Sequence, residues 1–203
     1  MATKKYYLDD NKTDILQCSW GVNWKNFKIE YNNQIIVNNS DRKSLLNGIT
    51  ICLTPDKTLY AKLKQGLTQE LELLINGQPI KGSATDPVQQ IRLAFALTLI
   101  IGGINIFLGL LALITNNQML LNLGLGMGSL VFGVVILVLA FGIKKEIAWA
   151  AFSVTGLLTI DIIISIYLSV NAGGNPSIAG IILRLFFIIY IYKGGQAIRK
   201  LKD

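Results

Sequence analysis

Histidine is absent from this 203-residue sequence. Its absence removes the commonest general base and a frequent metal ligand, and with them any serine–histidine or cysteine–histidine pair. A glycine-rich phosphate loop with its lysine is missing as well. We therefore predict no catalytic, cofactor-binding or metal-binding residues, and we expect that the protein is not an enzyme.

Cysteine is scarce, since Cys18 and Cys52 are the only two in the chain. Both fall in the first eighty residues, which the charge pattern discussed below assigns to the cytoplasm. Disulfides rarely persist in that reducing compartment. We predict that both thiols are unpaired.

Charged residues are few and unevenly distributed. They make up 15% of the chain against 52% hydrophobic residues, which is too apolar for an ordinary soluble domain. Residues 1–92 hold 12 of the 19 basic and 9 of the 12 acidic side chains. The pattern predicts a water-soluble part followed by a part that lies in lipid.

Four hydrophobic segments follow residue 92. A helix needs about 20 apolar residues to cross the hydrocarbon core of a bilayer. The breaks between the segments are short, so neighbouring helices should be antiparallel. No apolar leader opens the chain, and we expect the first span to act as the insertion signal. The predicted spans are 93–115, 119–142, 147–170 and 178–198, after a linker at 81–92.

The basic residues near these spans predict an orientation. Arg92, Lys144, Lys145 and the tail 199–203 flank helix ends on one side, whereas the other two breaks carry no charge. Positive flanks favour the cytoplasm. We predict a multi-pass protein of the plasma membrane, the inner membrane of a bacterium, with both termini cytoplasmic. The membrane half holds 7 basic and 3 acidic residues, mostly at helix ends, and residues 1–92 carry only +3 of the net charge of +7. No nucleic-acid partner is therefore expected.

Residues 1–80 alternate apolar and polar side chains with the period of a half-buried strand. Phe27, Ile29 and Tyr31 are one such set, and others follow at 49–54, 59–64 and 71–75. Asn32-Asn33 and Asn76-Gly77 suit tight hairpin turns. We predict a small all-β domain of six or seven strands, a sandwich or an open barrel, with a short helical turn at 41–47.

The junction reads Gly82-Ser83-Ala84-Thr85-Asp86-Pro87. A capping side chain at Thr85 or Asp86 followed by proline is a helix start signal. This hexapeptide, lying between a β-domain and four helices, resembles that of uncharacterised bacterial membrane proteins. The resemblance implies the layout of the chain and no activity.

Two residues of opposite charge fall deep inside the spans, Asp161 in the third and Arg184 in the fourth. A lone charge near the bilayer centre costs about 2.5–3.5 kcal/mol on insertion scales. Counted from the loop between them, they lie at depths of roughly 13 Å and 9 Å, a difference that a snorkelling arginine covers. We predict an ion pair, with Ser165 completing the hydrogen bonding of Asp161. The pair either clamps two helices or belongs to an ion or proton pathway.

Small residues recur at helical spacing. Gly102 and Gly109 are a heptad apart, and Gly124 and Gly128 form a Gly-x-x-x-Gly arrangement. Such positions allow close helix packing, within one subunit or between subunits of a homo-oligomer. Asn105 and Asn122 are candidates for a hydrogen bond between the first two spans.

Aromatic residues and lysines are interleaved near the N-terminus. Tyr6, Tyr7, Trp20 and Trp24 either contact a protein partner or lipid, or belong to the core and turns of the β-domain. We favour a non-enzymatic membrane protein whose cytoplasmic β-domain is a binding module anchored in the bilayer by four helices. The alternative is a channel or transporter subunit that uses Asp161 and Arg184.

Overall fold

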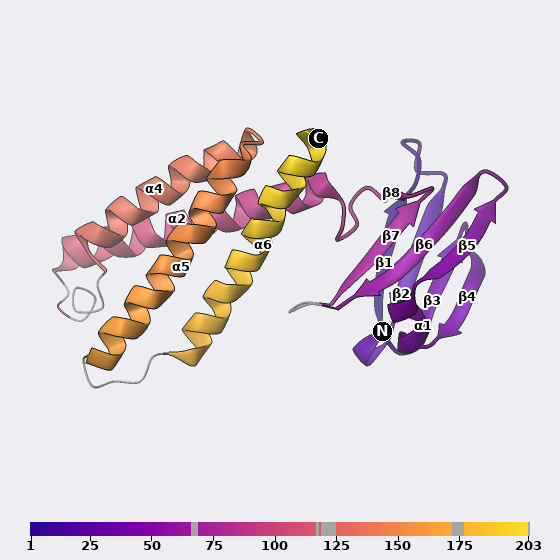
Figure 1. Cartoon of the computed structure of the whole chain (residues 1–203), viewed down its shortest axis with the longest axis horizontal. Helices are drawn as coiled ribbons and strands as arrows, with labels where there is room; N and C mark the ends of the chain where they lie inside the picture. Colours follow the sequence, from indigo (N-terminus) through magenta and orange to yellow (C-terminus); the bar gives the residue numbers. More distant parts are fainter. Residues whose placement is uncertain (66–68, 117, 119–124, 172–176, 203) are drawn as a thin grey trace. The chain divides into compact units, whose positions relative to one another are not determined.

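A computed structural model describes residues 1–65, 69–116, 118, 125–171 and 177–202 of the chain (Figure 1). The chain divides into two compact units, Met1–Gln89 and Gln90–Asp203. Each unit is considered by itself below, with the element labels of Figure 1.

The first unit is an all-β domain of two antiparallel four-stranded meanders, which confirms the predicted fold class. In each sheet the strands pair in chain order, and the helix α1 (Arg42–Asn47) connects the two sheets. The first sheet consists of β1 (Ala2–Tyr7), β2 (Ile15–Trp20), β3 (Phe27–Tyr31) and β4 (Gln34–Ser40), and the second of β5 (Ile49–Thr54), β6 (Lys57–Lys64), β7 (Glu70–Ile75) and β8 (Gln78–Pro79).

The core of this unit lies between the two sheets. Phe27 and Ile29 from β3 and Leu59 and Leu73 from the second sheet are completely buried. They belong to one cluster that takes side chains from both sheets and from Leu45 of α1. Of the two predicted forms, the domain is therefore a sandwich and not an open barrel.

The predicted hairpin turns are present. Asn32 and Asn33 have φ angles of 47° and 66°, and Asn76 and Gly77 have φ angles of 49° and 82°. Positive φ at both central residues matches the right-handed twist of the strands that the turn connects. The Asn76 side chain also accepts a hydrogen bond from the Thr58 N–H at 2.8 Å, which ties this turn to β6.

No strand was identified from the sequence at β1, β2 or β8. In β1 only Tyr6 is buried and the other five residues are exposed, so the strand has no clear alternation. β8 has two residues, too few for any pattern. The described residues thus contain eight strands where six or seven were expected.

The second unit consists of long antiparallel helices, as predicted (Figure 1). Four helices in the described part of the chain are long and apolar enough to cross a membrane. The last helix continues to Lys202 and so includes most of the basic segment 199–203 that was predicted as a tail. The predicted start of the second span, 119–124, lies outside the described residues. The helices are α2 (Pro87–Thr115), α4 (Met127–Lys144), α5 (Ala148–Asn171) and α6 (Ile178–Lys202).

The start of α2 follows from the junction sequence. Pro87 is the first helical residue, where its missing N–H leaves no unsatisfied donor. The Asp86 carboxylate accepts hydrogen bonds from the Val88 N–H at 3.0 Å and from the Gly82 N–H at 2.7 Å. Asp86 therefore caps the helix.

Candidate functional site

The structure brings Asp161 and Arg184 together on neighbouring helices. The Arg184 Nε lies 3.4 Å from the Asp161 Oδ2, and the two side chains remain 38% and 37% exposed. Strong charge-assisted hydrogen bonds are nearer about 2.8 Å. The pair is therefore formed but open, on a face that the chain itself does not close.

Ser165 has a different role from the one expected. Its hydroxyl accepts a hydrogen bond from Arg184 Nη1 at 2.9 Å, so it serves the arginine and not Asp161. Both contacts join α5 to α6, and a clamp between the two helices is the direct structural consequence.

Glycines bring α2 and α4 into close contact. A Cβ added to Gly102 would lie 2.7 Å from the Leu137 side chain and 3.1 Å from the Gly133 carbonyl oxygen. One added to Gly109 would lie 3.0 Å from the Gly126 oxygen. A side chain at either position would therefore force Leu137 or the facing backbone of α4 to move.

The matching pair on α4 is not the predicted one. A Cβ on Gly128 would meet nothing within 4 Å, so Gly128 makes no close helix contact, and Gly124 lies outside the described residues. Gly126 and Gly133, a heptad apart like Gly102 and Gly109, face those two residues instead. This equal spacing is the signal in the sequence that could have identified the contact.

Asn105 makes its contact between helices with a serine. The Ser129 hydroxyl lies 3.1 Å from the Asn105 side-chain oxygen and 3.1 Å from its backbone oxygen, while the amide of Asn105 donates to the Ile101 carbonyl. The predicted partner Asn122 lies outside the described residues. This bond lies one helical turn from the glycine contacts and adds a polar link to them.

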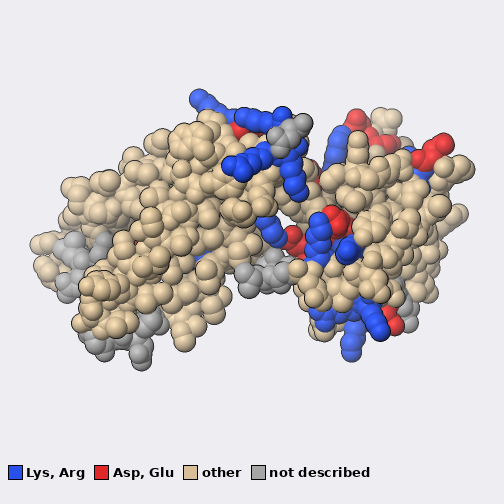
Figure 2. Space-filling view, viewed as in Figure 1, with Lys and Arg blue, Asp and Glu red and all other residues tan. Residues whose placement is uncertain are grey.

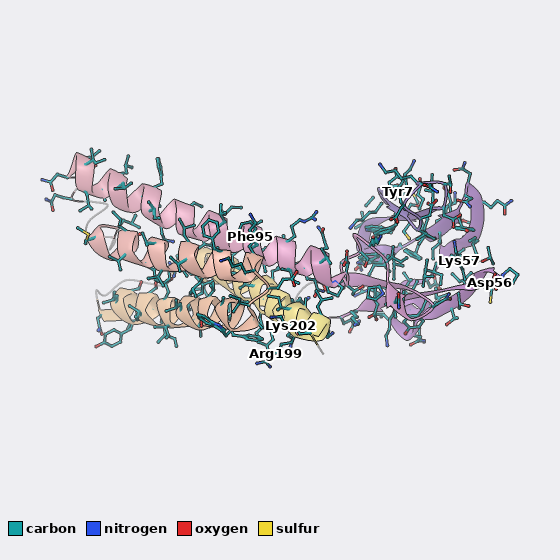
Figure 3. All side chains as sticks on the ribbon, turned by 90° about the horizontal axis from the view of Figure 1, so that it is seen from above. Tyr7, Asp56, Lys57, Phe95, Arg199 and Lys202 are labelled. Carbon is teal, nitrogen blue, oxygen red and sulfur yellow. The ribbon has the colours of Figure 1, made fainter. Side chains whose placement is uncertain are left out.

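One end of the helical unit is strongly basic. It is formed by the start of α2, the turn between α4 and α5, and the end of α6 (Figures 1 and 2). Several of these cations lie over aromatic rings: Lys144 is 5.7 Å from the ring centre of Phe95, and Arg199 is 4.6 Å from that of Phe152. Figure 3 labels Phe95 on α2 and Arg199 and Lys202 on the last turns of α6. The basic residues at this end are Arg92, Lys144, Lys145, Lys193, Arg199, Lys200 and Lys202.

A polar cluster around Asp14 joins the two sheets of the β-domain. One oxygen of this carboxylate accepts hydrogen bonds from the Tyr31 hydroxyl at 3.0 Å and the Asn32 amide at 3.2 Å, and the other pairs with Lys57. These bonds, that of Lys57 above all, hold the pKa of Asp14 below its ordinary value. Lys57 lies beside the β5–β6 turn (Figure 3), so the cluster connects β6 to β3.

Trp20 and Trp24 stack on each other at the tight loop after β2. Their ring centres are 4.8 Å apart, with the planes 14° from parallel, and both pack on the edge of the core. The loop is closed by the Gly21 N–H, which donates to the Lys25 oxygen at 2.7 Å. It presents Val22, which is 91% exposed.

The backbone of this loop is held in an uncommon conformation. Asn23, Trp24 and Asn26 have φ angles of 56°, 63° and 54°. Asparagine tolerates this region, but for a bulky residue it is an outlier that costs about 1–3 kcal/mol. Stacking of the two tryptophans offsets about 0.5–1.5 kcal/mol of that cost.

The two tyrosines differ. Tyr6 belongs to the core, where burial raises the pKa of its hydroxyl above the ordinary value, so it offers no surface to a partner. Tyr7 is exposed and, with Leu8, lines a shallow cavity of about 230 Å³ between β1 and the residues after β7. Lys81 and Asp10 form an ion pair of 3.0 Å at its rim.

Both cysteines are free thiols. Cys18 is buried in the core, and burial raises the pKa of its thiol to about 12, which makes it unreactive at neutral pH. Cys52 is exposed on β5. Among the described residues no group of three acidic or cysteine side chains is arranged to hold a metal ion.

Comparisons with known proteins provide no relative. No protein-family model, no curated protein and no solved structure matches the chain. The resemblance based on the junction stays a prediction.

Proposed function

We propose that the chain is a non-enzymatic membrane protein whose β-sandwich is an interaction module, held at the cytoplasmic face of a bacterial inner membrane by a four-helix anchor. Four apolar helices make it a multi-pass membrane protein. The non-enzymatic role rests on the absence of histidine and of any catalytic motif in the sequence.

The charge difference between the two ends of the helical unit supports the orientation. Lysines and arginines flank α2, α4 and α6 at one end, whereas the described residues at the other end, such as Asn116, Asn171 and Ser177, carry no charge. Cations favour the cytoplasmic side. The β-domain precedes the basic end of α2 in the chain, so it is cytoplasmic in this proposal.

The observation that carries the interaction role is the strained loop at Trp24. A tryptophan at a φ of 63° is retained at a cost in stability, and such strain clusters at functional sites. The loop presents Val22 to solvent beside two stacked indole rings. Tryptophan is the residue most enriched at binding hot spots. We infer that this loop docks a protein partner.

Substitution at the loop tip tests this role in the full-length protein. Val22→Asp should leave the fold intact because the side chain is exposed, yet reduce the recovery of a specific partner from native membranes about tenfold, a loss of about 1.4 kcal/mol in binding. Ile35→Asp, at an exposed apolar position on β4, is the matched control. Quantitative mass spectrometry of the three purifications gives the measurement. Equal recovery of every protein by wild type and Val22→Asp would contradict the role of the loop.

The open Asp161–Arg184 pair favours a second candidate function, that of a channel or transporter subunit. Charged groups within membrane spans often mark ion or proton routes. This function predicts a proton or potassium flux in liposomes containing the purified protein, and its loss in Asp161→Asn. Wild-type liposomes no more permeable than empty ones would exclude those two fluxes and leave the pair as a clamp.

A further inference from the structure

Packing in α5 and α6 differs along their length. The buried residues of α5 end at Ile162, and those of α6 begin at Ile191. The remainder of the two helices, residues 163–171 and 178–190, is called here the distal segment. None of its described residues is buried, and in Figure 1 both helices run away from α2 and α4 toward their connecting loop. The described residues therefore leave this part of the bundle uncovered.

The polar groups of the distal segment, together with Asp161 just before it, are incompletely matched. Arg184 has five N–H donors in a planar fork, of which the structure uses Nε toward Asp161 and one hydrogen of Nη1 toward Ser165. No described residue bonds the other guanidinium hydrogens or the Asp161 Oδ1. Lipid tails offer neither donors nor acceptors, so each such group is costly in the bilayer.

Apolar residues extend the same face of α5. Ile164 and Leu168 lie three and seven residues after Asp161, which places them on one side of the helix. Both are largely exposed. The face thus combines an open ion pair with adjacent apolar surface, as an interface inside a membrane does.

We propose that a second copy of this chain packs on the Asp161 side of the distal segment. The face holds one acid and one base side by side, so a two-fold axis places the carboxylate of each copy near the guanidinium of the other. The unused hydrogens of Arg184 then bond Asp161 of the second copy. A lipid supplies no such match, and a partner with charge of a single sign satisfies only one member of the pair. This proposal is independent of the role assigned to the Trp24 loop.

Cysteine cross-linking in native membranes tests the proposal. In a Cys52→Ser background, in which buried Cys18 is unreactive, Leu168→Cys should give cross-linked dimers with a short bifunctional maleimide. The matched control is Ile163→Cys. The two positions are similarly exposed, at 59% and 61%, but Ile163 lies on the opposite side of α5 from Asp161. Both variants retain the ion pair, and both replace exposed side chains, so neither removes buried packing.

The expected result is a yield of dimer several-fold higher for Leu168→Cys than for Ile163→Cys. Equal yields, or none for either, would overturn the proposal. Subunit counting by single-molecule photobleaching in dilute lipid bilayers provides the second measurement. The wild type should be a dimer, and a wild type that is monomeric under these conditions also overturns the proposal.

Charge variants distinguish the ion pair from apolar packing as the source of dimerisation. Arg184→Gln should lower the dimer fraction, whereas the double variant Asp161→Arg with Arg184→Asp keeps a self-complementary face and should restore it. Restoration supports cross-pairing between copies. A double variant that is no more dimeric than Arg184→Gln, while remaining monodisperse and helical, would contradict cross-pairing.

Discussion

Two acid–base pairs of the described residues lie in very different surroundings. Asp14 pairs with Lys57 at the surface of the β-domain and also accepts bonds from Tyr31 and Asn32. Asp161 pairs with Arg184 between two apolar helices at 3.4 Å, and the further hydrogen bond given by the described residues joins Arg184 to Ser165. Water can bond the donors and acceptors that the first pair leaves without a partner, but lipid tails cannot do so for the second pair. The pair with fewer hydrogen bonds thus lies in lipid, where groups without a partner cost more free energy. The proposed second copy of the chain would supply the missing partners.

The same contrast applies to apolar side chains. Phe27→Ala should lower the free energy of unfolding of the β-domain by about 3–5 kcal/mol, because a buried phenylalanine leaves a cavity. Phe107→Ala, at an exposed position on α2, should change stability little. The side chain faces lipid whether the helices are packed together or separated. Reactivity of Cys18 during heating, measured in a Cys52→Ser background, reports unfolding of the β-domain. Heat aggregation follows unfolding of the bundle. Similar losses of stability for Phe27→Ala and Phe107→Ala would contradict this contrast.

Close packing in the bundle depends on glycine at some positions and not at others. Gly133→Leu should destabilise the bundle by about 1–3 kcal/mol, since even a Cβ there would meet Ile106 at 2.7 Å. Gly128→Ala should be neutral or stabilising by up to about 1 kcal/mol, because nothing opposes the methyl group and alanine favours helix. Thermal aggregation of the purified protein in detergent ranks the two variants. The reverse order would show that α2 and α4 do not approach as described.

The sequence predicted what depends on local patterns. Three such features depend only on neighbouring residues, and the structure has each of them. They are the alternation of Phe27, Ile29 and Tyr31, the turn at Asn32-Asn33 and the helix start at Pro87. Apolar length sufficed for the spans, because a bilayer imposes one thickness on every helix.

Other features depend on relationships that a single segment does not contain. Which glycine of α4 faces Gly102 depends on how two helices are aligned in depth, and the structure selects Gly133. Ser165 was assigned to Asp161 from helical spacing, but the reach of Arg184 from the next helix decides its bond. The strained conformation of Trp24 has no signal in composition.

Acid should act on the β-domain through Asp14. Its bonds hold the folded pKa below the ordinary value, so this carboxylate stabilises the fold above about pH 5. That contribution is lost as the pH falls through the lowered pKa. Asp14→Asn should cost about 1 kcal/mol at neutral pH, after allowance for solvent screening, and should flatten the loss of stability between about pH 5 and 3. Trapping of Cys18 at a series of pH values with a dipyridyl disulfide, a reagent that still reacts with thiols in acid, measures both effects. An unchanged acid profile would contradict the assignment.

The smallest effect should come from the exposed pair of Lys81 and Asp10. Both side chains are almost fully in water, at 85% and 94% exposure, where ion pairs contribute little. Lys81→Gln should leave the melting temperature of the β-domain unchanged. A clear decrease would show that the rim of the Tyr7 cavity is more structured than its exposure indicates.

Cys52 tests the proposed location of the β-domain on the cytoplasmic side of a four-helix membrane anchor. This exposed native thiol should react with a membrane-impermeant maleimide only after intact cells are permeabilised. Ser177→Cys, exposed just before α6 at the opposite end of the bundle, should react without permeabilisation. Labelling of Cys52 in intact cells, with Ser177→Cys protected, would reverse the orientation and contradict the account.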